Sequence, residues 1–520
     1  MKRSTLPLLL FLGLLALAVC VTGRAGAQSL VDGVGSEPRT ADPYFHAEEP
    51  TNALNWNLYD GLTRFDADYK LRSALASTWE AVSDTTWIFH LVKGVRFHDG
   101  TPFTAEDVKF SIQRCGTWAR SGYKDSVAQI ERVEVVDPLT VKIITKGPFG
   151  ILPAMMARVM IMSKAYVEKS GDDAQVTKPI GTGAYKLKEW IRGDHLGLVA
   201  NEDYFRGAPK IKQVTIRPLT NDATRTAALL SGEVHIINDV PVQDVARLKA
   251  DVKVDVAVRD SVRAIFLQMD QSREKSPKVE SPTGKNPFLD VRVRKAVYLA
   301  INEEAIVKHI MNGFATAASQ MYPSAIFGYD ESIKRPAYDP EKAKALLKEA
   351  GYPNGFTVTL DAPNDRYVND EQIAQAVAAD LARVGIRVKV NAIPKNTFFP
   401  LLDRFDSSFS LIGWGNNPPD AIRFLDTNTH TIDNAKGLGR YNYGMYANPK
   451  VDKLIDDSSR SLKQEERAKL MKEAQRIALV EDQAYIPLHF QVNIHASTKK
   501  LKWMPRADNY HIYADMELSQ

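Results

Sequence analysis

Residues 87–114 read WIFHLVKGVRFHDGTPFTAEDVKFSIQR, and this stretch predicts a strand, a tight turn and a capped helix in direct succession. In residues 87–92 large apolar side chains recur in the two-residue period of a half-buried strand. An Asp-Gly pair then turns the chain, Thr104 can N-cap the helix, and Asp107 can complete an approximate capping box. By itself the stretch indicates a surface hairpin followed by a short helix.

The order of residues within this stretch says more. Residues 93–108 resemble the signature of the family 5 solute-binding proteins, which are the oligopeptide, dipeptide and nickel receptors of bacterial ABC importers. Other stretches agree with the family in the expected order along nearly the whole chain. They are Leu58-Tyr-Asp-Gly-Leu62, Pro179-Ile-Gly-Thr-Gly-Ala-Tyr185, Asp290-Val-Arg-Val-Arg-Lys-Ala296, Tyr338-Asp-Pro-Glu-Lys-Ala343 and Asn364-Asp-Arg-Tyr367. On these motifs the chain is identified as a member of the family, with its ligand left open.

The resemblance implies an α/β, bilobal periplasmic-binding-protein (Venus-flytrap) fold with an extra subdomain in the first lobe. We expect lobe 1 to span residues 28–270, with the extra subdomain at about 65–188, and to be completed by residues 493–520. Lobe 2 would span residues 271–492. Such a protein captures its solute between the lobes and delivers it to an inner-membrane permease heterodimer driven by cytoplasmic ATPases.

The N-terminus predicts export. Two basic residues precede an apolar run at 6–19, and Ala25-Gly-Ala27 offers a small-residue cleavage site, so residues 1–27 are typical of a signal peptide. The run is too short to span a membrane comfortably. A lipoprotein anchored at Cys20 is the alternative, but Val19 occupies the position where such sites need a small residue. The expected location is the periplasm.

The composition narrows the class of the exported protein. Cleavage removes three basic residues and no acidic one, which leaves 64 basic residues against 63 acidic ones. A nearly neutral chain without a basic stripe does not favour nucleic-acid binding. Cleavage also leaves Cys115 as the one cysteine, so no intramolecular disulfide can form. The length predicts at least two domains, and we expect a monomer.

The chain changes character along its length. Residues 28–266 suggest strands with few helices, and the Pro/Ser/Lys-rich stretch 276–287 is the best candidate linker, with a hinge just before it. After it, a strand at 356–360, a helix at 369–384 and a strand at 386–393 predict a βαβ unit. A final strand at 485–492 precedes a tail that the family resemblance returns to the first lobe.

No motif predicts catalysis. The sequence contains no Gly-x-Ser-x-Gly, His-Glu-x-x-His, Cys-x-x-Cys or Walker loop, so we expect neither an enzyme nor a cofactor. The ten His residues are scattered, which disfavours a preformed metal cage. His430 is a weak candidate for one ligand of a chelated metal, whereas His90 and His98 fit packing and turn formation better.

The candidate ligand site lies where a strand at 409–413 runs into Trp414-Gly-Asn-Asn-Pro-Pro-Asp420, a loop at the carboxyl end of a sheet. In the dipeptide receptors of the family an acidic residue in this loop pairs with the ligand's amino terminus, but Asn416 or Asn417 occupies that region here. Burying a ligand ammonium without its carboxylate costs roughly 2–5 kcal/mol, which disfavours a tight dipeptide site. Asp420 fits either ligand contact or a helix cap.

Charged and aromatic residues complete the candidate site. The Arg that holds the ligand carboxylate in the dipeptide receptors is replaced here, where the alignment gives Glu371 and Gln372. Arg366 lies just upstream and could form a bidentate contact with a carboxylate, or it could pair with a neighbouring Asp. Stacking walls suit peptides and sugars alike. The aromatic candidates are Tyr367, Trp414, Tyr441, Tyr443, Tyr44 and Phe45, the last followed by His46.

These observations favour a receptor for peptides or similarly sized amphoteric solutes. An oligosaccharide is the nearest rival, because Trp414 and the two Asn residues offer an uncharged pattern, and opines or nickel chelates are further alternatives. Among other classes of protein, a secreted hydrolase is disfavoured because the sequence lacks nucleophile motifs. A receptor that presents its ligand to a chemosensor remains open.

Overall fold

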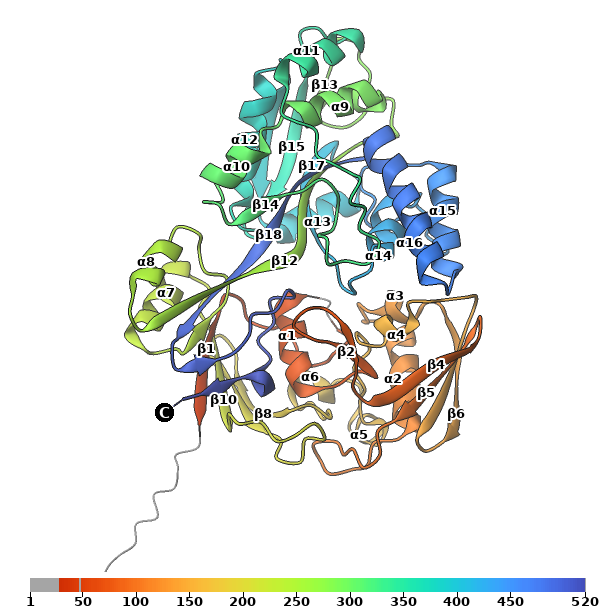
Figure 1. Cartoon of the computed structure of the whole chain (residues 1–520), viewed down its shortest axis with the longest axis vertical. Coiled ribbons are helices and arrows are strands. Elements are labelled where there is room, and N and C mark those ends of the chain that lie inside the picture. Colours follow the sequence, from red (N-terminus) through yellow and green to blue (C-terminus); the bar gives the residue numbers. More distant parts are fainter. Residues whose placement is uncertain (1–27, 46–47, 520) are drawn as a thin grey trace, which may run out of the picture.

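The computed structural model describes residues 28–45 and 48–519. It shows two lobes, which we call the first lobe (lower in Figure 1) and the second lobe (upper). The predicted signal peptide, Cys20 and His46 lie outside the described residues. Among the helices of the described part, none has both the length and the apolar character needed to cross a membrane.

One mixed sheet runs through both lobes and comprises twelve strands within the described residues. Its two long strands, β12 (Val254–Met269) and β18 (Tyr485–Thr498), pair antiparallel and pass from one lobe to the other (Figure 1). The first lobe contributes β1 (Ser29–Val34), β8 (Tyr185–Ile191), β9 (His195–Ala200), β10 (Gln213–Pro218) and β11 (Ile236–Ile237). The second lobe contributes β13 (Val279–Glu280), β14 (Ala315–Ala317), β15 (Thr357–Pro363), β16 (Arg387–Ile393) and β17 (Phe409–Gly415).

The crossing between the lobes contains a register shift. Asp260 of β12 faces Val492 of β18, but the next pair in the ladder is Ala264 with Phe490, so β12 carries extra residues at this point. Such bulges bend a strand and increase its twist. The crossing therefore lies upstream of the stretch 276–287, part of which forms β13 and pairs with β15 in the second lobe.

The first lobe carries a separate sheet in the order β4-β5-β7-β6. Its strands are β4 (Ala76–Ser83), β5 (Thr86–Leu91), β6 (Ile130–Asp137) and β7 (Thr140–Thr145), and β2 (Thr63–Phe65) pairs with β3 (Leu71–Ser73) beside it. Helix α2 (Ala105–Thr117) packs on this sheet and begins as the sequence predicts. Asp107 accepts hydrogen bonds from the backbone N–H and the hydroxyl of Thr104.

The expectation of few helices before residue 266 is wrong. Seven further helices accompany α2 in that part of the described chain, and several are single turns with too few apolar residues to show a helical period. They are α1 (Glu49–Leu58), α3 (Lys124–Val127), α4 (Leu152–Met155), α5 (Lys164–Ser170), α6 (Ala174–Thr177), α7 (Asp222–Ser231) and α8 (Val245–Ala250).

The second lobe contains the predicted βαβ unit, in which β15, α12 (Asp370–Ala382) and β16 follow one another and the two strands pair in parallel. The lobe's other helices are α9 (Val291–Ala300), α10 (Glu303–His309), α11 (Pro340–Glu349), α13 (Lys395–Asp403), α14 (Ile422–Phe424), α15 (Pro449–Arg460) and α16 (Gln464–Gln475). Residues 499–519 return to the first lobe, where β19 (Leu501–Lys502) pairs with β20 (Glu517–Leu518) and His511 contacts Asp32 of β1.

Three of the sequence motifs meet inside the first lobe. A Cβ atom on Gly181 would lie 2.1 Å from the carbonyl oxygen of Leu58, and one on Gly183 would lie 2.3 Å from the Leu58 carbonyl carbon. His98 contacts the same loop, with Nε2 3.0 Å from the Gly183 carbonyl oxygen, and burial lowers the pKa of His98 to about 4. Thr182 donates a hydrogen bond to Asp60 at 2.9 Å. These motifs build the core of the lobe.

Candidate functional site

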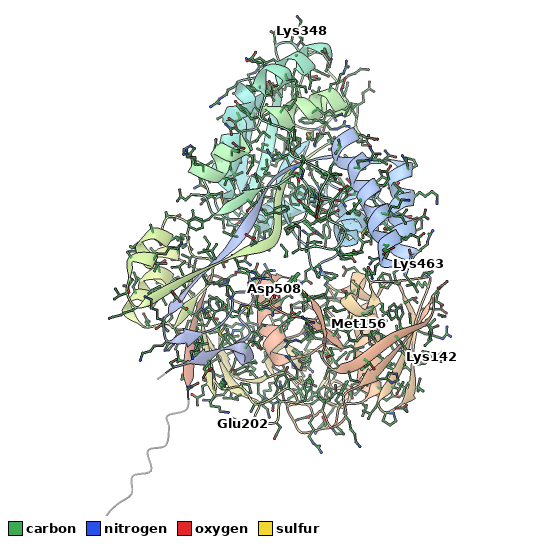
Figure 2. All side chains as sticks on the ribbon, in the orientation of Figure 1. Lys142, Met156, Glu202, Lys348, Lys463 and Asp508 are labelled. Atoms are coloured by element: carbon green, nitrogen blue, oxygen red, sulfur yellow. The ribbon has the colours of Figure 1, made fainter. Side chains whose placement is uncertain are left out.

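The two lobes are in contact along the side that carries α16. Figure 2 shows Lys463, at the start of α16, next to the first lobe, while Met156 lies inside that lobe. A Cβ atom on Gly150 of the first lobe would lie 2.9 Å from the Ser461 carbonyl oxygen of the second lobe. Packing this close leaves no room for solvent at that point, so the two lobes touch there.

An ion-pair group, which we call the interlobe latch, joins the lobes. Asp125 on α3 accepts from Arg158 of its own lobe at 3.3 Å and from Arg423 on α14 of the other lobe at 2.6 Å. Burial by itself would raise the pKa of Asp125, but the two guanidinium groups outweigh it and hold the pKa at about 2. The latch is therefore ionised at neutral pH.

Two predicted residues lie together at the carboxyl ends of neighbouring strands. The Tyr367 hydroxyl, after β15, donates to the Gly413 carbonyl of β17 at 3.1 Å. A Cβ atom on Gly413 would lie 2.6 Å from the Tyr367 ring, so only glycine permits this approach. Arg366 lies over the same ring, with its guanidinium carbon 5.3 Å from the ring centroid. Tyr367 thus serves as a platform for Arg366.

A charged cluster (Glu49, Asp239, Arg263, Arg366 and Asn509) spans both lobes beside Tyr367. Arg263, in the bulge of β12, approaches Glu49 of α1 at 3.3 Å. Asn509 donates to Glu49 at 2.6 Å and to Asp239 at 3.0 Å. Burial and then the charge of Arg366 lower the pKa of Arg263. Within residues 28–45 and 48–519, Arg366 forms no ion pair within 4.0 Å.

Of the residues in this cluster, only Arg366 was predicted from the sequence. Glu49 is the first residue of α1, Arg263 lies within β12 and Asn509 lies in the C-terminal tail. None of these three residues belongs to a recognisable sequence motif. Burial and the neighbouring Asp239 raise the pKa of Glu49. The cluster therefore offers guanidinium donors and carboxylate acceptors side by side.

Two of the predicted aromatic residues, Tyr441 and Tyr443, form one group with Trp414. Its ring lies 5.4 Å from that of Tyr441 and 6.3 Å from that of Phe424, centroid to centroid. The indole N–H of Trp414 is buried and has no hydrogen-bond partner among the described residues. Tyr443 is buried and donates its hydroxyl proton to Asp403 at 3.0 Å. Trp414 and the half-buried Tyr441 remain candidates for ligand contact.

Asn416 has a different role from the one expected. Its side chain is fully buried, and its amide donates to the carbonyl oxygens of Val262 and Met321, both at 3.0 Å. These bonds fasten the end of β17 to β12 and to a neighbouring loop. The neighbouring Asn417 is half-buried, and its side-chain oxygen has no partner among the described residues.

The carboxylate of Asp420 binds other groups of the protein in this structure. It forms an ion pair with Arg467 of α16 at 2.8 Å, and it accepts a hydrogen bond from the backbone N–H of Ile422 at 3.1 Å. Burial raises its pKa, and Arg467 opposes that rise. The helix-capping alternative therefore describes its contacts better than ligand binding does.

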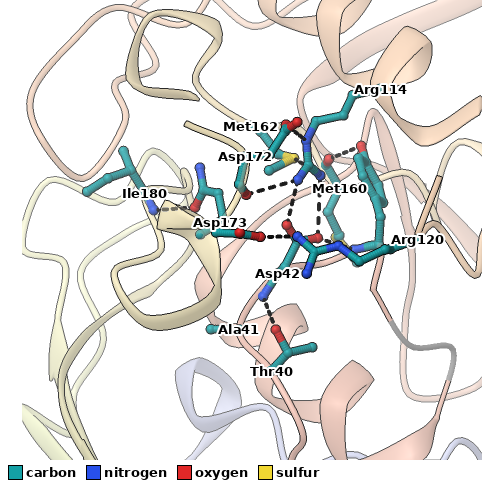
Figure 3. Close-up of polar contacts among 12 residues, drawn as sticks. Thr40, Ala41, Asp42, Arg114, Arg120, Met160, Met162, Asp172, Asp173 and Ile180 are labelled. Atoms are coloured by element: carbon teal, nitrogen blue, oxygen red, sulfur yellow. Dashed lines mark hydrogen bonds and ion pairs between the residues drawn. The ribbon is translucent and has the colours of Figure 1, made fainter. Parts of the chain in front are cut away.

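Tyr44 belongs to the core of the first lobe and not to the cleft. Its hydroxyl donates to the Met160 carbonyl at 2.6 Å, and it lies beside the buried ion pair of Asp42 with Arg114 (Figure 3). Phe45 packs against Trp118, with ring centroids 5.8 Å apart. Both candidates thus contact the first lobe itself.

His430 also contacts its own lobe. Its Nδ1 lies 2.6 Å from the Thr431 carbonyl oxygen, and its ring nitrogens lie 3.7 and 3.5 Å from Asp452 and Asp456 of α15. No group of three or more residues suited to a metal ion occurs in the described part of the chain.

A separate cavity of about 410 Å³, which we call the interlobe cavity, opens between the lobes on the α16 side. The first lobe lines it with Phe65, Tyr69, Leu71, Trp79, Trp87, Gly150, Ile151, Pro153 and Ala154. The second lobe lines it with Ala325, Phe327, Pro418, Pro419, Asp420, Gln464 and Arg467.

Comparison with known proteins identifies the family to which this two-lobed chain is similar. Residues 70–436 match the model of the bacterial extracellular solute-binding proteins, family 5. The glutathione-binding protein GsiB of Escherichia coli O1:K1 is 30% identical over 503 residues, covering 94% of this chain and 95% of its own.

Solved structures agree with this match. The periplasmic binding protein DppA of Helicobacter pylori, in complex with the peptide STSA, has a TM-score of 0.81 at 26% identity, covering 95% of this chain and 99% of its own. MoaA of A. tumefaciens R10, in complex with mannopinic acid, has a TM-score of 0.79 at 27% identity, with coverage of 95% and 100%.

The shared fold places this chain among proteins that bind a substrate for transport and do not transform it. The family is extracellular or periplasmic. The chain belongs to the family 5 bacterial extracellular solute-binding proteins and is the substrate-binding component of an ABC transporter.

Proposed function

We propose that the substrate is a small peptide or a similarly sized amphoteric solute whose carboxylate binds Arg366. The proposal rests on Arg366, which lies in a cluster shared by both lobes and has no ion-pair partner within 4.0 Å in the part of the chain that the structure describes. A guanidinium matches a carboxylate bidentately. The acidic members of the cluster, Glu49 and Asp239, are placed to attract the ligand's amino group.

The named relatives support this chemistry. The names of the three proteins compared above refer to glutathione, a peptide and mannopinic acid. Glutathione and peptides both combine an amino group with a carboxylate. A cluster that presents both charge signs suits such molecules better than it suits an uncharged sugar.

Binding acts through closure. A ligand that touches Arg366 of the second lobe and Glu49 of the first gains contacts in the closed form that the open form cannot supply. Its binding energy therefore shifts the population toward the closed form, and no bond in the ligand is broken. The ring of Tyr367, which lies against both Arg366 and Arg263, excludes water from the charged contact and so strengthens it.

The partners and the export route are part of the same proposal. The closed monomer would dock on an inner-membrane permease heterodimer whose cytoplasmic ATPases drive import. It would reach the periplasm through the signal peptide at residues 1–27. We also propose that the lobes divide near the crossing of β12 and β18, with the β4–β7 sheet as the extra subdomain.

Replacing Arg366 tests the proposed substrate class. Hydrogen bonds to charged groups contribute about 1.5–3 kcal/mol, so Arg366→Gln should raise the Kd for a tripeptide about tenfold to 150-fold by calorimetry. A tripeptide with an amidated C-terminus should bind the parent protein weakly and should lose little further affinity in the variant.

Arg404→Gln is the matched control, because Arg404 is exposed and pairs with Asp406, two residues further along the chain. It should leave the Kd unchanged. Equal affinities of Arg366→Gln and the parent for the acid peptide would remove Arg366 from the site. A sugar recovered from the purified protein by native mass spectrometry would favour the oligosaccharide alternative.

Opening the interlobe latch should weaken binding without touching the ligand. Asp125→Asn leaves Arg423 without its charged partner, and breaking such a pair costs roughly 2–5 kcal/mol. We expect the ligand-bound variant to show a larger radius of gyration in solution scattering, and a Kd raised by about thirtyfold or more.

The control for the latch is Glu134→Gln, which removes an exposed carboxylate from β6 paired with Lys142. Its scattering profile and Kd should match those of the parent. If Asp125→Asn closes as fully as the parent does, then packing at Gly150 and not the latch holds the lobes together.

A further inference from the structure

We infer that the interlobe cavity is a second ligand site, one that takes an uncharged molecule with an aromatic ring and carbonyl acceptors. The cavity is distinct from the charged cluster, with which it shares no lining residue. This inference does not depend on the proposed substrate.

The walls of the cavity are aromatic and preformed. Phe65 and Tyr69 stack with their centroids 5.5 Å apart and their planes inclined by 23°. Trp79 lies on the first-lobe wall, and Phe327 faces from the second lobe. A cavity of about 410 Å³ between such walls is within the size range of small-molecule sites, which are lined mainly by apolar and aromatic groups.

Two buried hydrogen-bond donors in the lining have no acceptor. Trp87 is 9% exposed as a whole residue, and the side chain of Arg467 is 2% exposed. The indole N–H of Trp87 and the Nε–H of Arg467 are buried, and neither has a partner among the described residues. Leaving a buried donor unpaired costs about 1–3 kcal/mol. Both donor atoms are covered in this structure, so an occupant that supplies acceptors recovers this cost once the two side chains turn toward the cavity.

The charge balance of the lining selects an uncharged occupant. Asp420 and Arg467 are the charged lining residues, and they neutralise each other at 2.8 Å. A charged ligand would lose its hydration in this cavity without gaining a counter-charge. Carbonyl oxygens satisfy both donors without that loss, and a ring fills the space between the aromatic walls.

The site bridges the lobes. Trp87 belongs to the first lobe and Arg467 to the second, so an occupant that accepts from both stabilises the closed form. Binding at the cavity should therefore be linked reciprocally to binding at the cleft.

A labelled probe can localise the binding. We would incorporate 5-fluorotryptophan at the seven Trp positions of the exported chain and titrate it with N-acetylphenylalanine amide, which is uncharged and carries one ring and two carbonyl groups. The expected result is a saturable shift of the fluorine signals of Trp79 and Trp87. N-acetylglycine amide, which lacks the ring, should bind at least tenfold more weakly.

Two variants make the test specific. Trp87→Phe keeps the ring but removes the donor, and the loss of one neutral hydrogen bond should raise the Kd about fivefold. Ala154→Leu fills part of the cavity and should raise the Kd at least tenfold. Trp190→Phe is the matched control, because its indole donates to Glu37 on the far side of the lobe, and it should leave the Kd unchanged.

The outcomes separate this site from the cleft. Arg366→Gln should leave the affinity for the uncharged probe unchanged, whether or not it affects the tripeptide. A probe that shifts only the Trp414 signal binds in the cleft and overturns the inference. So does a Kd that is the same in the parent, Trp87→Phe and Ala154→Leu.

Discussion

Replacing Gly183 with alanine should lower the free energy of unfolding by about 3 kcal/mol or more. The new Cβ would lie 2.3 Å from the Leu58 carbonyl carbon and 2.6 Å from the Tyr59 nitrogen. Both atoms are backbone, so no side chain can rotate away and α1 itself would have to move. Urea denaturation followed by tryptophan fluorescence measures the loss.

Gly147→Ala is the control, since a Cβ at that position would meet no atom within 4 Å. Its free energy of unfolding should stay within about 0.5 kcal/mol of the parent value. A Gly183→Ala protein as stable as Gly147→Ala would show that the turn at residues 181–183 can separate from α1 without cost.

Replacing Arg114 with methionine should cost about 3–5 kcal/mol of stability, because it leaves a buried carboxylate without its partner. Arg114 reaches Asp42 at 2.8 Å and Asp172 at 2.9 Å, and Asp42 is fully buried (Figure 3). Methionine preserves most of the apolar length of the side chain, so the loss reports the charge and not a cavity.

Arg120→Met is the matched control, because Arg120 pairs with Asp173 in solvent, where the side chains are 44% and 75% exposed. Exposed pairs contribute at most about 1 kcal/mol. Adding Asp42→Asn to Arg114→Met should recover most of the loss, since no buried charge then remains. If the double variant is no more stable than Arg114→Met, the buried charge is not the cause.

The Arg114→Met deficit should also depend on pH. Burial raises the pKa of Asp42 in the folded protein, and Arg114 opposes that rise. Without Arg114 the folded-state pKa rises further above the unfolded value of about 3.9. A carboxyl with a raised folded-state pKa contributes stability that is complete below the unfolded pKa and lost as pH rises through the folded one. The variant's deficit should therefore shrink as the pH is lowered.

Helices and strands were predicted well where a short run of residues sets the backbone conformation by itself. The Thr104 and Asp107 pair marked the start of α2, and the alternation of strand and helix marked the βαβ unit of β15, α12 and β16. The same patterns missed the single-turn helices of the first lobe, because one turn is too short to show a helical period.

The site was predicted less completely, for a different reason. Arg366 and Tyr367 are predicted site residues because they follow a strand end, where ligands bind in open α/β sheets. Asn416 also follows a strand end, yet its amide donates hydrogen bonds to the carbonyl oxygens of Val262 and Met321, which are far away in the sequence. Whether a loop side chain faces the cleft or the core depends on such distant partners.

The sequence by itself determined the family, the two-lobed α/β fold and the strand ends at which the candidate site lies, because motifs and periodicity report short-range structure. Only the tertiary structure decided the charged cluster, since Glu49, Arg263, Arg366 and Asn509 meet where β12 and β18 cross between the lobes. The same holds for the interlobe cavity, where Trp87 and Arg467 belong to separate lobes. Their chemistry arises from packing between segments hundreds of residues apart, which no local pattern records.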